Sequence, residues 1–199
     1  IWKVYRRPAQ VVYPPVAVES FYWRSPEDYF LAVAELVPYK RLDYAIRFFS
    51  HCGRRLRIVG EGPEYRRLRR IAGPNVEFCG RTSDEQLREL YARCRALILP
   101  GEEDFGMTAV ESVASGKPVI ALGRGGVLES VPAGGGFFYT QPNEDALSGA
   151  VNSFESAEPA IQADALRASA GRFSEREFVR GIQALLGARH REPSGIQFD

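Results

Sequence analysis

The sequence of 199 residues contains few of the side chains from which metal centres, disulfide frameworks and thiol-dependent sites are built. Two histidines are too few for a histidine metal site, and the three cysteines are far apart in sequence, with no Cys-x-x-Cys pair. We therefore expect no metal ion, no disulfide and no thiol catalysis. Widely spaced cysteines suit reduced thiols, which we expect to be buried as small apolar side chains: Cys52, Cys79 and Cys94.

An excess of charge of either sign is also missing. The chain carries 26 basic and 25 acidic residues, which gives a formal net charge of +1 at pH 7. This balance argues against nucleic acid as a partner, because nucleic-acid binding depends on clustered positive charge. Long hydrophobic runs are missing as well. The longest uncharged stretch, residues 130–143, contains three consecutive glycines and two prolines, so the sequence predicts no transmembrane segment.

The sequence does have the composition of a globular chain, with 45% hydrophobic and 26% charged residues. We expect one folded domain over residues 1–187 and a frayed polar tail over residues 188–199. The first seven residues form neither a signal peptide nor a presequence, and there is no starting methionine. We therefore expect a cytoplasmic chain that begins within a longer protein.

Short apolar segments alternate with segments of helical periodicity along the whole chain. The expected strands are residues 30–33, 56–59, 76–79, 96–100, 118–122 and 136–140. The expected helices are residues 42–49, 65–71, 84–94 behind a Ser83-x-x-Gln86 capping box, 107–115, 125–131, 143–154, 157–170 and 174–187. These repeated units predict an α/β fold: a doubly wound, mostly parallel, Rossmann-like sheet in three α-β-α layers. Ligands of such sheets bind beyond the carboxyl ends of the strands.

The glycines after the second expected strand invite a dinucleotide-binding interpretation. Gly60-x-Gly62 matches the first two glycines of Gly-x-Gly-x-x-Gly, but the third position is Tyr65. A nicotinamide-dependent oxidoreductase is therefore disfavoured, and no P-loop motif is present. Gly60 fits either a tight strand-to-helix turn or direct contact with a ligand.

The segment Glu102–Glu111 carries most of the chemistry that the sequence offers. Three acids follow a buried strand, and the carboxylates of Glu103 and Glu111 can face one crevice. The helix start between them offers unpaired backbone N–H groups to an anion, at Gly106, Met107 and Thr108. The alternative is that the acids only complement the helix dipole and that Glu111 is solvated, and the spacing alone does not decide between the two.

Further motifs surround this segment in a fixed order. They are Val11–Val16, Leu36–Asp43, Val59–Pro63, Phe78–Arg81, Glu103-x7-Glu111 with Phe105-Gly106, Ala114–Ala121, and Gly125-Gly126-x-x-Glu129. Together they resemble the donor-binding half of glycosyltransferase family 4, the retaining group 1 enzymes of GT-B architecture. The resemblance implies that an N-terminal acceptor-binding domain is absent from this chain, and that any peripheral contact with a membrane would be made through that missing half.

The resemblance implies a nucleoside-diphosphate sugar as the donor and assigns roles to individual residues. Glu103 would face the hydroxyls of the donor sugar and Lys40 would neutralise the diphosphate leaving group, so these are the expected catalytic residues. Glu111 would accept hydrogen bonds from the ribose hydroxyls. The other expected donor contacts are Phe105, Gly106, Met107 and Thr108 through their amides, Gly80 and Arg81 near the base, and Gly60. The family needs no metal or other cofactor.

One position departs from the family pattern. Family members carry an arginine five residues before the lysine, where this chain has Glu35. A carboxylate there repels a diphosphate, and Arg41 is the nearest substitute cation. Two hypotheses remain: a hexosyltransferase fragment that binds the donor without transferring the sugar, and a non-catalytic Rossmann-like binding or scaffold domain with a weakened phosphate site. Residues 39–41 and 102–105 are similar to those of mannosyltransferases and favour GDP-mannose as the donor.

Overall fold

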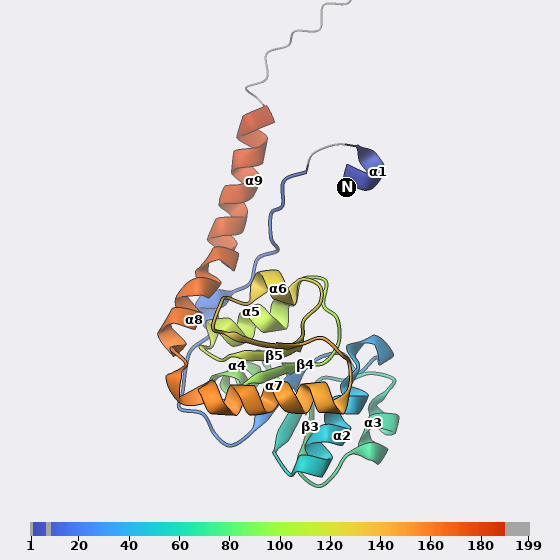
Figure 1. Ribbon diagram of the computed structural model, residues 1–199. Helices are drawn as coiled ribbons and strands as arrows, with labels where there is room; N and C mark the ends of the chain where they lie inside the picture. The colour runs from blue at the N-terminus through green and yellow to red at the C-terminus, as the bar shows by residue number, and fades with distance from the viewer. Residues whose placement is uncertain (1, 7–8, 190–199) are drawn as a thin grey trace, which may run out of the picture.

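The computed structural model describes residues 2–6 and 9–189 of the chain. Its centre is a six-stranded sheet in which every neighbouring pair is parallel, in the order β3-β2-β1-β4-β5-β6 (Figure 1). The strands are β1 (Phe30–Val33), β2 (Leu56–Val59), β3 (Val76–Gly80), β4 (Leu97–Leu99), β5 (Val119–Leu122) and β6 (Gly136–Tyr139). This order is that of a doubly wound Rossmann-like fold, so the predicted fold class is confirmed.

Two hydrophobic cores lie on opposite faces of the sheet, because successive strand residues point to opposite sides. In β1, Phe30 and Ala32 belong to one core and Leu31 to the other. The first face is covered by α2 (Leu42–Cys52), α3 (Tyr65–Ile71) and α7 (Glu144–Ala157). The second face is covered by α4 (Asp84–Arg93), α5 (Met107–Ala114), α6 (Val127–Ser130) and α8 (Ala163–Ala170). The sheet therefore lies between two helical layers, as expected.

Local sequence signals fix where several helices begin and end. The predicted capping box of α4 is confirmed: Ser83 Oγ accepts from the N–H of Gln86 at 3.2 Å, and Gln86 Oε1 accepts from the N–H of Ser83 at 3.1 Å. Asn143 caps α7 in a similar way, since its Oδ1 accepts from the N–H of Ala146 at 2.9 Å. These caps give both helices a defined start after a strand.

The expected helix over residues 157–170 is wrong in its first part. A 3-10 turn, Glu158–Ala160, follows α7 there, and α8 begins only at Ala163. Pro159 lies in that turn and lacks the N–H that would continue a helix. Short turns that the pattern did not predict are α1 (Trp2–Tyr5) and the 3-10 turns Val18–Ser20, Pro38–Lys40 and Gly171–Phe173.

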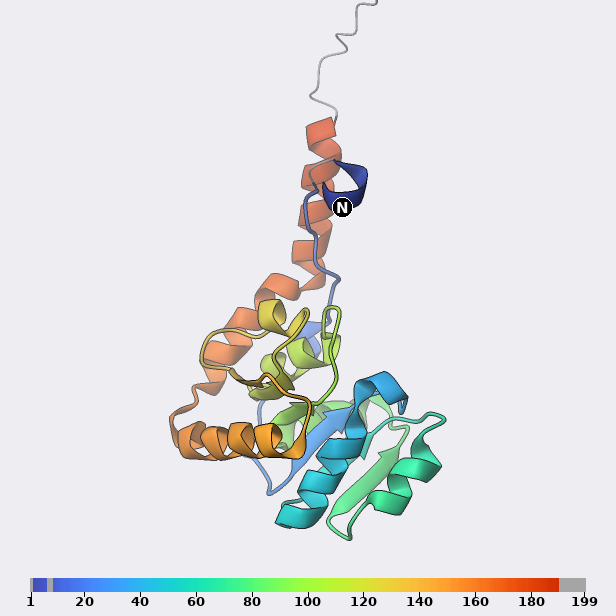
Figure 2. The ribbon, with the colours of Figure 1, turned by 45° about the vertical axis from the view of Figure 1, so that its right-hand side comes forward.

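The C-terminal helix α9 (Glu175–Arg189) and the N-terminal segment leave the body of the fold together. In both views α9 projects away from the sheet, and the segment after α1 runs beside it (Figures 1 and 2). A Cβ placed on Gly181 would lie 3.2 Å from Cγ1 of Val12, so the two segments touch there. The tail was expected to begin at residue 188, but α9 continues through residues 188 and 189, and the rest of the expected tail of residues 188–199 lies outside the described residues. None of the helices in the described ranges is long and apolar enough to span a membrane.

The order of the strands reverses between β1 and β4 in the middle of the sheet. The connection after β1 therefore leads to α2 on one face, and the connection after β4 leads to α5 on the other. The two loops separate at the carboxyl edge of the sheet. Open α/β sheets bind their ligands in the crevice at such a reversal.

Candidate functional site

A cavity of about 720 Å³, the first cavity, opens at this reversal of strand order. Its walls are the loop after β1, the acidic loop after β4 and the start of α5. The expected site residues Phe105, Gly106, Met107 and Thr108 line it. Its charged lining, among the described residues, comprises one cation and four acids: Lys40, Glu35, Glu102, Glu103 and Asp104. The structure therefore brings both expected catalytic residues to one cavity.

Lys40 and Glu103 are joined directly across the crevice. Nζ of Lys40 donates hydrogen bonds to Oε1 of Glu103 at 2.7 Å and to Oε2 at 2.8 Å. The two side chains are 17% and 14% exposed, so the pair is shielded from water without being sealed from the cavity. Charge-assisted hydrogen bonds of this length are among the stronger polar interactions in proteins. They orient an ammonium and a carboxylate toward the same ligand volume.

The acidic loop is held in place by backbone contacts with a pair of glycines. Glu103 forms an isolated parallel bridge with Gly125, and the N–H of Gly126 donates to the carbonyl oxygen of Glu103 at 2.7 Å. A Cβ on Gly126 would lie only 2.2 Å from the carbonyl oxygen of Asp104. No separate role was predicted for this glycine pair from the sequence. Adjacent glycines after a buried strand were the available signal that another backbone passes close by.

The start of α5 presents free backbone donors to the first cavity. Gly106 precedes the helix in the left-handed conformation, at φ 80°, and makes no side-chain cap. Within the described ranges, the N–H groups of Met107 and Thr108 have no hydrogen-bond acceptor. Unpaired N–H groups at the positive end of a helix dipole favour an anion. Unpaired N–H groups are therefore present in the cavity that Lys40 also lines, and their binding of a donor stays a prediction.

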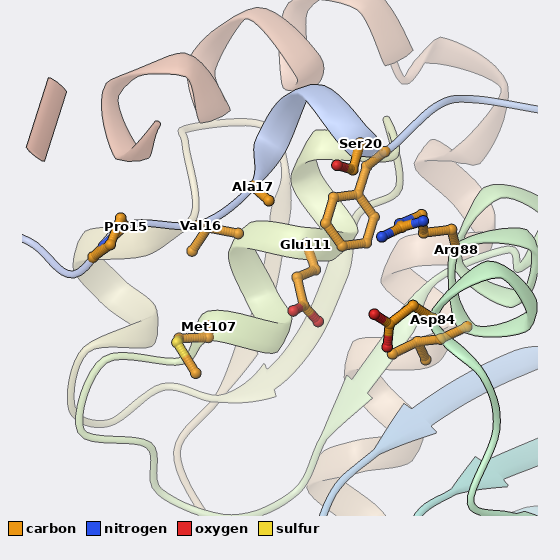
Figure 3. A pocket seen from close by; sticks show the side chains of 10 residues that line it. Pro15, Val16, Ala17, Ser20, Asp84, Arg88, Met107 and Glu111 are labelled. Carbon is orange, nitrogen blue, oxygen red and sulfur yellow. The ribbon is translucent and has the colours of Figure 1, made fainter. Parts of the chain in front are cut away.

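Glu111 lines a second cavity of about 250 Å³ (Figure 3). This second cavity shares Met107 with the first. Its walls are α4, α5 and residues 15–21 of the N-terminal segment. The carboxylate of Glu111 accepts a hydrogen bond from the hydroxyl of Tyr91 at 2.8 Å. Burial raises the pKa of Glu111, and the nearby negative charge of Asp84 adds to the effect. Glu111 is therefore a partly buried group at the edge of the core, which differs from a solvated helix residue.

Glu103 and Glu111 do not share one crevice as the spacing suggested. Each lines its own cavity, and Met107 is common to both. The difference arises because residues 15–21 and α4 line the cavity of Glu111 but not the cavity of Lys40. The arrangement is a row in which Lys40 and Glu103 come first, Met107 lies between, and Glu111 follows.

Two of the expected donor contacts lie apart from this row. Arg81 lines a separate hollow together with Cys79 and Arg93, on a different face of α4 from the one that lines the second cavity. Gly80 lies directly before it at the end of β3. The structure thus places the loop after β3 beside α4, without bringing the Arg81 side chain to either cavity.

Gly60 has a position dictated by backbone packing. Its φ is +132°, and a Cβ added there would lie 1.9 Å from the carbonyl oxygen of Ala34. Its N–H donates to the carbonyl oxygen of Gly80 at 2.9 Å. The tight turn that was one of the two interpretations of Gly60 is what the structure shows. The residue supports the loop that carries Glu35 and Lys40.

The unusual Glu35 is exposed and lines the first cavity with Lys40. Arg41 is directed elsewhere: its guanidinium lies 3.4 Å from Oδ1 of Asp43 and 5.4 Å from the ring centroid of Tyr44. It does not line the first cavity, so Arg41 does not replace the missing arginine in this structure. No cluster of histidine, cysteine, aspartate and glutamate among the residues described is arranged to hold a metal ion.

A family model described as Glycosyl transferases group 1 matches residues 18–172 of the chain. The chain belongs to the group 1 glycosyltransferases. The matched range contains Lys40, Glu103 and Glu111 together with all six strands of the sheet. The predicted membership of the group 1 glycosyltransferases is thereby confirmed.

Relatives of this group 1 glycosyltransferase chain are longer proteins. An uncharacterized glycosyltransferase of Methanocaldococcus jannaschii is 32% identical over 128 residues, which are 62% of this chain and 36% of that protein. The GDP-mannose-dependent alpha-(1-6)-phosphatidylinositol dimannoside mannosyltransferase of Mycobacterium tuberculosis is 31% identical over 137 residues, 67% of this chain and 36% of that protein. The chain therefore spans about a third of these relatives.

A solved structure shows the same fold over nearly the whole group 1 glycosyltransferase chain. HepE of Anabaena, crystallised with UDP and glucose, superposes with a TM-score of 0.77 at 23% identity. The match covers 89% of this chain and 56% of HepE. The likeness establishes the Rossmann-like architecture, and it shows that this fold accounts for about half of the longer protein.

Proposed function

We propose that this chain binds the donor of a retaining hexosyltransferase, a nucleoside-diphosphate hexose, across the two cavities that meet at Met107. The observation that carries the proposal is the ammonium of Lys40, held 2.7 and 2.8 Å from the oxygens of Glu103 beside the unpaired amides of α5. A cation with free N–H groups suits a diphosphate, and a carboxylate suits the hydroxyls of a sugar. Retention of configuration rests on the resemblance of the motifs to the retaining group 1 enzymes.

Each polar group of the row has a role in the proposed complex. Lys40 donates hydrogen bonds to the diphosphate and stabilises the negative charge that develops on the leaving group. Glu103 accepts hydrogen bonds from the sugar hydroxyls and orients the sugar. Glu111 accepts hydrogen bonds from the ribose hydroxyls. These hydrogen bonds replace the water that burial removes from the ionised carboxylate. Tyr91 keeps the Glu111 carboxylate in place.

The amides of α5 and the ammonium of Lys40 supply positive charge from the chain itself. We therefore propose that donor binding requires no metal ion and no further cofactor. A chelating agent is expected to leave the affinity for the donor unchanged. The Kd measured with EDTA and the Kd measured with added Mg²⁺ provide the test.

Mannose is the hexose that the relatives favour. The Mycobacterium tuberculosis relative is named as GDP-mannose-dependent, and an alpha-1,3/1,6-mannosyltransferase of Dictyostelium discoideum is 38% identical over 78 residues. HepE, which resembles this chain only in fold, is solved with UDP and glucose. We propose GDP-mannose as the donor. Because the longer relatives contain a further part, we propose that this chain alone binds the donor without transferring the sugar.

A second candidate function is supported by Glu35. Its carboxylate lines the cavity that would hold the diphosphate, where the family pattern has an arginine. A non-catalytic binding or scaffold domain would retain the fold and tolerate this repulsion. Changing Glu35 to arginine separates the two candidates: a large gain in affinity for nucleoside diphosphates indicates a lapsed site, and an unchanged affinity indicates that Glu35 is compatible with donor binding.

Isothermal titration of the chain with GDP-mannose and UDP-glucose tests the proposal. Lys40→Met is expected to weaken binding of the donor about tenfold or more, because a charged hydrogen bond to the diphosphate is lost. Glu111→Ala is expected to weaken it by a similar factor. Arg176→Met removes a cation from α9 that is 89% exposed and serves as the matched control, with no expected change.

The outcome that contradicts the proposal is equally concrete. If the unaltered chain binds neither donor at millimolar concentration, or if Lys40→Met and Glu111→Ala bind as tightly as the control, the two cavities are not a donor site.

A further inference from the structure

Strand β6 is the last strand of the sheet, so one side of its backbone has no neighbouring strand. On its other side, the N–H of Gly123 donates to the carbonyl oxygen of Tyr139 at 2.8 Å. Alternate residues of a strand direct their N–H and C=O groups to opposite sides, so those of Gly136 and Phe138 face away from β5. Within the described ranges, these outward groups have no hydrogen-bond partner. The edge therefore offers unpaired donors and acceptors to a further strand.

The edge at β6 lacks the charges with which sheets normally block such pairing. Residues 130–143, which contain the strand and the segments on both sides of it, carry no charged side chain. The opposite edge of the sheet differs: β3 carries Glu77, whose carboxylate is ion-paired with Arg57 at 3.0 Å. Pro132 and Pro142 lie outside β6 and leave its own N–H groups intact. One edge of the sheet is thus protected by charge, and the other is open.

An apolar patch accompanies the open edge. The side chain of Phe138 is 40% exposed, and Leu128 on α6 is exposed as well. A Cβ placed on Gly123 would lie 3.2 Å from Cβ of Phe138 and 3.9 Å from Cδ2 of Leu128, so the two side chains flank this glycine. The ring of Phe138 lies across Gly136, where an added Cβ would be 2.4 Å from Cζ of the ring. The apolar side chains and the unpaired backbone therefore belong to one continuous surface.

The absence of charge favours a partner with the same edge. A strand that carries charge of one sign meets like charge when it pairs with its own copy, and opposed like charges are destabilising. This obstacle is missing over the whole of residues 130–143. We propose that β6 pairs antiparallel with β6 of a second copy of this chain, around a two-fold axis at Phe138. Such an isologous contact is closed, so it gives a dimer and no larger assembly.

The two-fold axis places like residues opposite each other only at position 138. There the N–H of Phe138 in each copy donates to the carbonyl oxygen of Phe138 in the other, and the two rings lie beside each other on one face. Gly136 of each copy faces Thr140 of the other. The carbonyl oxygen of Thr140 accepts from Nη2 of Arg124 at 3.1 Å and retains a second lone pair for this contact.

Pairing at β6 leaves the candidate donor site accessible. The first cavity opens at the carboxyl end of the sheet between β1 and β4, and β5 separates β4 from β6. In an antiparallel pair the carboxyl ends of the two sheets point in opposite directions, so the two copies of this cavity are directed away from each other. The proposed dimer therefore does not rest on donor binding.

Sedimentation equilibrium of the chain of residues 1–199 tests the proposal. We expect the mean molar mass to rise from 22.2 kDa toward twice that value as the concentration increases from about 5 µM to about 500 µM. Phe138→Lys and Phe138→Glu each place like charges opposite one another and are expected to remain monomeric. Mixed in equal amounts, the two variants are expected to recover the dimer, because opposite charges then meet across the axis. Recovery on mixing also shows that both variants are folded.

Matched variants test the place and the register of the contact. Val179→Lys changes another exposed apolar residue, on α9, and is expected to dimerise like the unaltered chain. Phe138→Cys is expected to give a disulfide-linked dimer on oxidation with diamide, because the two Cα atoms of such a pair are about 5.5 Å apart. Thr140→Cys lies on the same exposed edge, but its two copies would be about 14 Å apart and are expected not to cross-link.

Three results would overturn the proposal. The first is an unaltered chain that stays monomeric at the highest concentration, or a mixture of Phe138→Lys and Phe138→Glu that forms no dimer. The second is a dimer that Val179→Lys dissociates and Phe138→Lys does not, which would place the interface on the exposed apolar face of α9. The third is equal cross-linking of Phe138→Cys and Thr140→Cys, which is incompatible with a two-fold axis at Phe138.

Discussion

Lys40 and Lys117 lie at opposite ends of the same sheet and have opposite surroundings. Lys40 follows β1, borders an open cavity and is paired with the carboxylate of Glu103. Lys117 lies two residues before the start of β5 and is only 2% exposed. Its Nζ donates to the carbonyl oxygen of Arg24 at 2.8 Å and lies 5.3 Å from the ring centroid of Trp23. Lys117 has no carboxylate within ion-pairing distance in the described residues, and burial lowers its pKa to about 8.

The difference between the two lysines shows how the two ends of the sheet are built. At the carboxyl end, loops are brought close together by glycines, and the charged groups remain free to exchange partners with a ligand. At the amino end, a charged side chain is enclosed and holds the N-terminal segment against β5. The first arrangement leaves a cation available for binding, and the second uses a cation to complete the fold.

The largest expected effect comes from changing Gly60, whose close approach supports the loop with Lys40. Gly60→Ala places a Cβ 1.9 Å from the carbonyl oxygen of Ala34, at a φ of +132°. We expect the free energy of unfolding to fall by about 3 kcal/mol or more, because both backbones must move. Gly149→Ala in α7 meets no atom within 4 Å and is the control, with an expected gain of about 0.5–1 kcal/mol. Urea denaturation measures both, and equal stabilities would contradict the prediction.

A second prediction concerns the amino end and depends on pH. The pKa of Lys117 is about 8 in the folded chain and 10.5 as its ordinary value. Between these values the unfolded chain binds more protons, so the free energy of unfolding rises with pH in that window. Relative to Lys117→Met, the unaltered chain is expected to gain about 2 kcal/mol between pH 7 and pH 9.5.

Urea denaturation at several pH values measures this difference for the two proteins. Burial raises the pKa of the neighbouring Cys94 to about 12, so its thiol stays protonated throughout the window. The loss of the hydrogen bond to Arg24 in the methionine variant does not depend on pH and leaves the slope unaffected. Parallel stability curves would show that Lys117 is not the buried charge that the structure presents.

The sequence predicted the elements that depend on local pattern. All six strands and the capping box of α4 were recognisable, because buried strands are continuously apolar and the cap needs only Ser83 and Gln86. The acidic loop and the amides of α5 were also predicted, since three acids directly precede a helix start. These features need no knowledge of how distant segments pack.

Features that depend on distant segments were not predictable. The Lys40–Glu103 pair joins residues 63 positions apart, and its distances follow from the strand order. The separation of Glu111 from the first cavity results from packing of the N-terminal segment against α4 and α5. The contact of Gly126 with the acidic loop requires β4 and β5 to be neighbours. Periodicity and spacing do not carry this information.

The smallest expected effect on stability comes from replacing Lys40. It tests directly whether Lys40, unlike Lys117, contributes little to holding the fold together. Lys40→Met leaves the Glu103 carboxylate without its cation, but that carboxylate faces a water-accessible cavity and is 14% exposed. We expect a loss of only about 1 kcal/mol, close to that of a partly exposed ion pair. The double variant Lys40→Met with Glu103→Gln should recover part of this loss, because no unpaired charge remains. Urea denaturation at pH 7 measures all of these variants. A loss of about 3–5 kcal/mol for Lys40→Met is the cost of breaking a fully buried pair, and it would place Lys40 with Lys117 among the groups that hold the fold together.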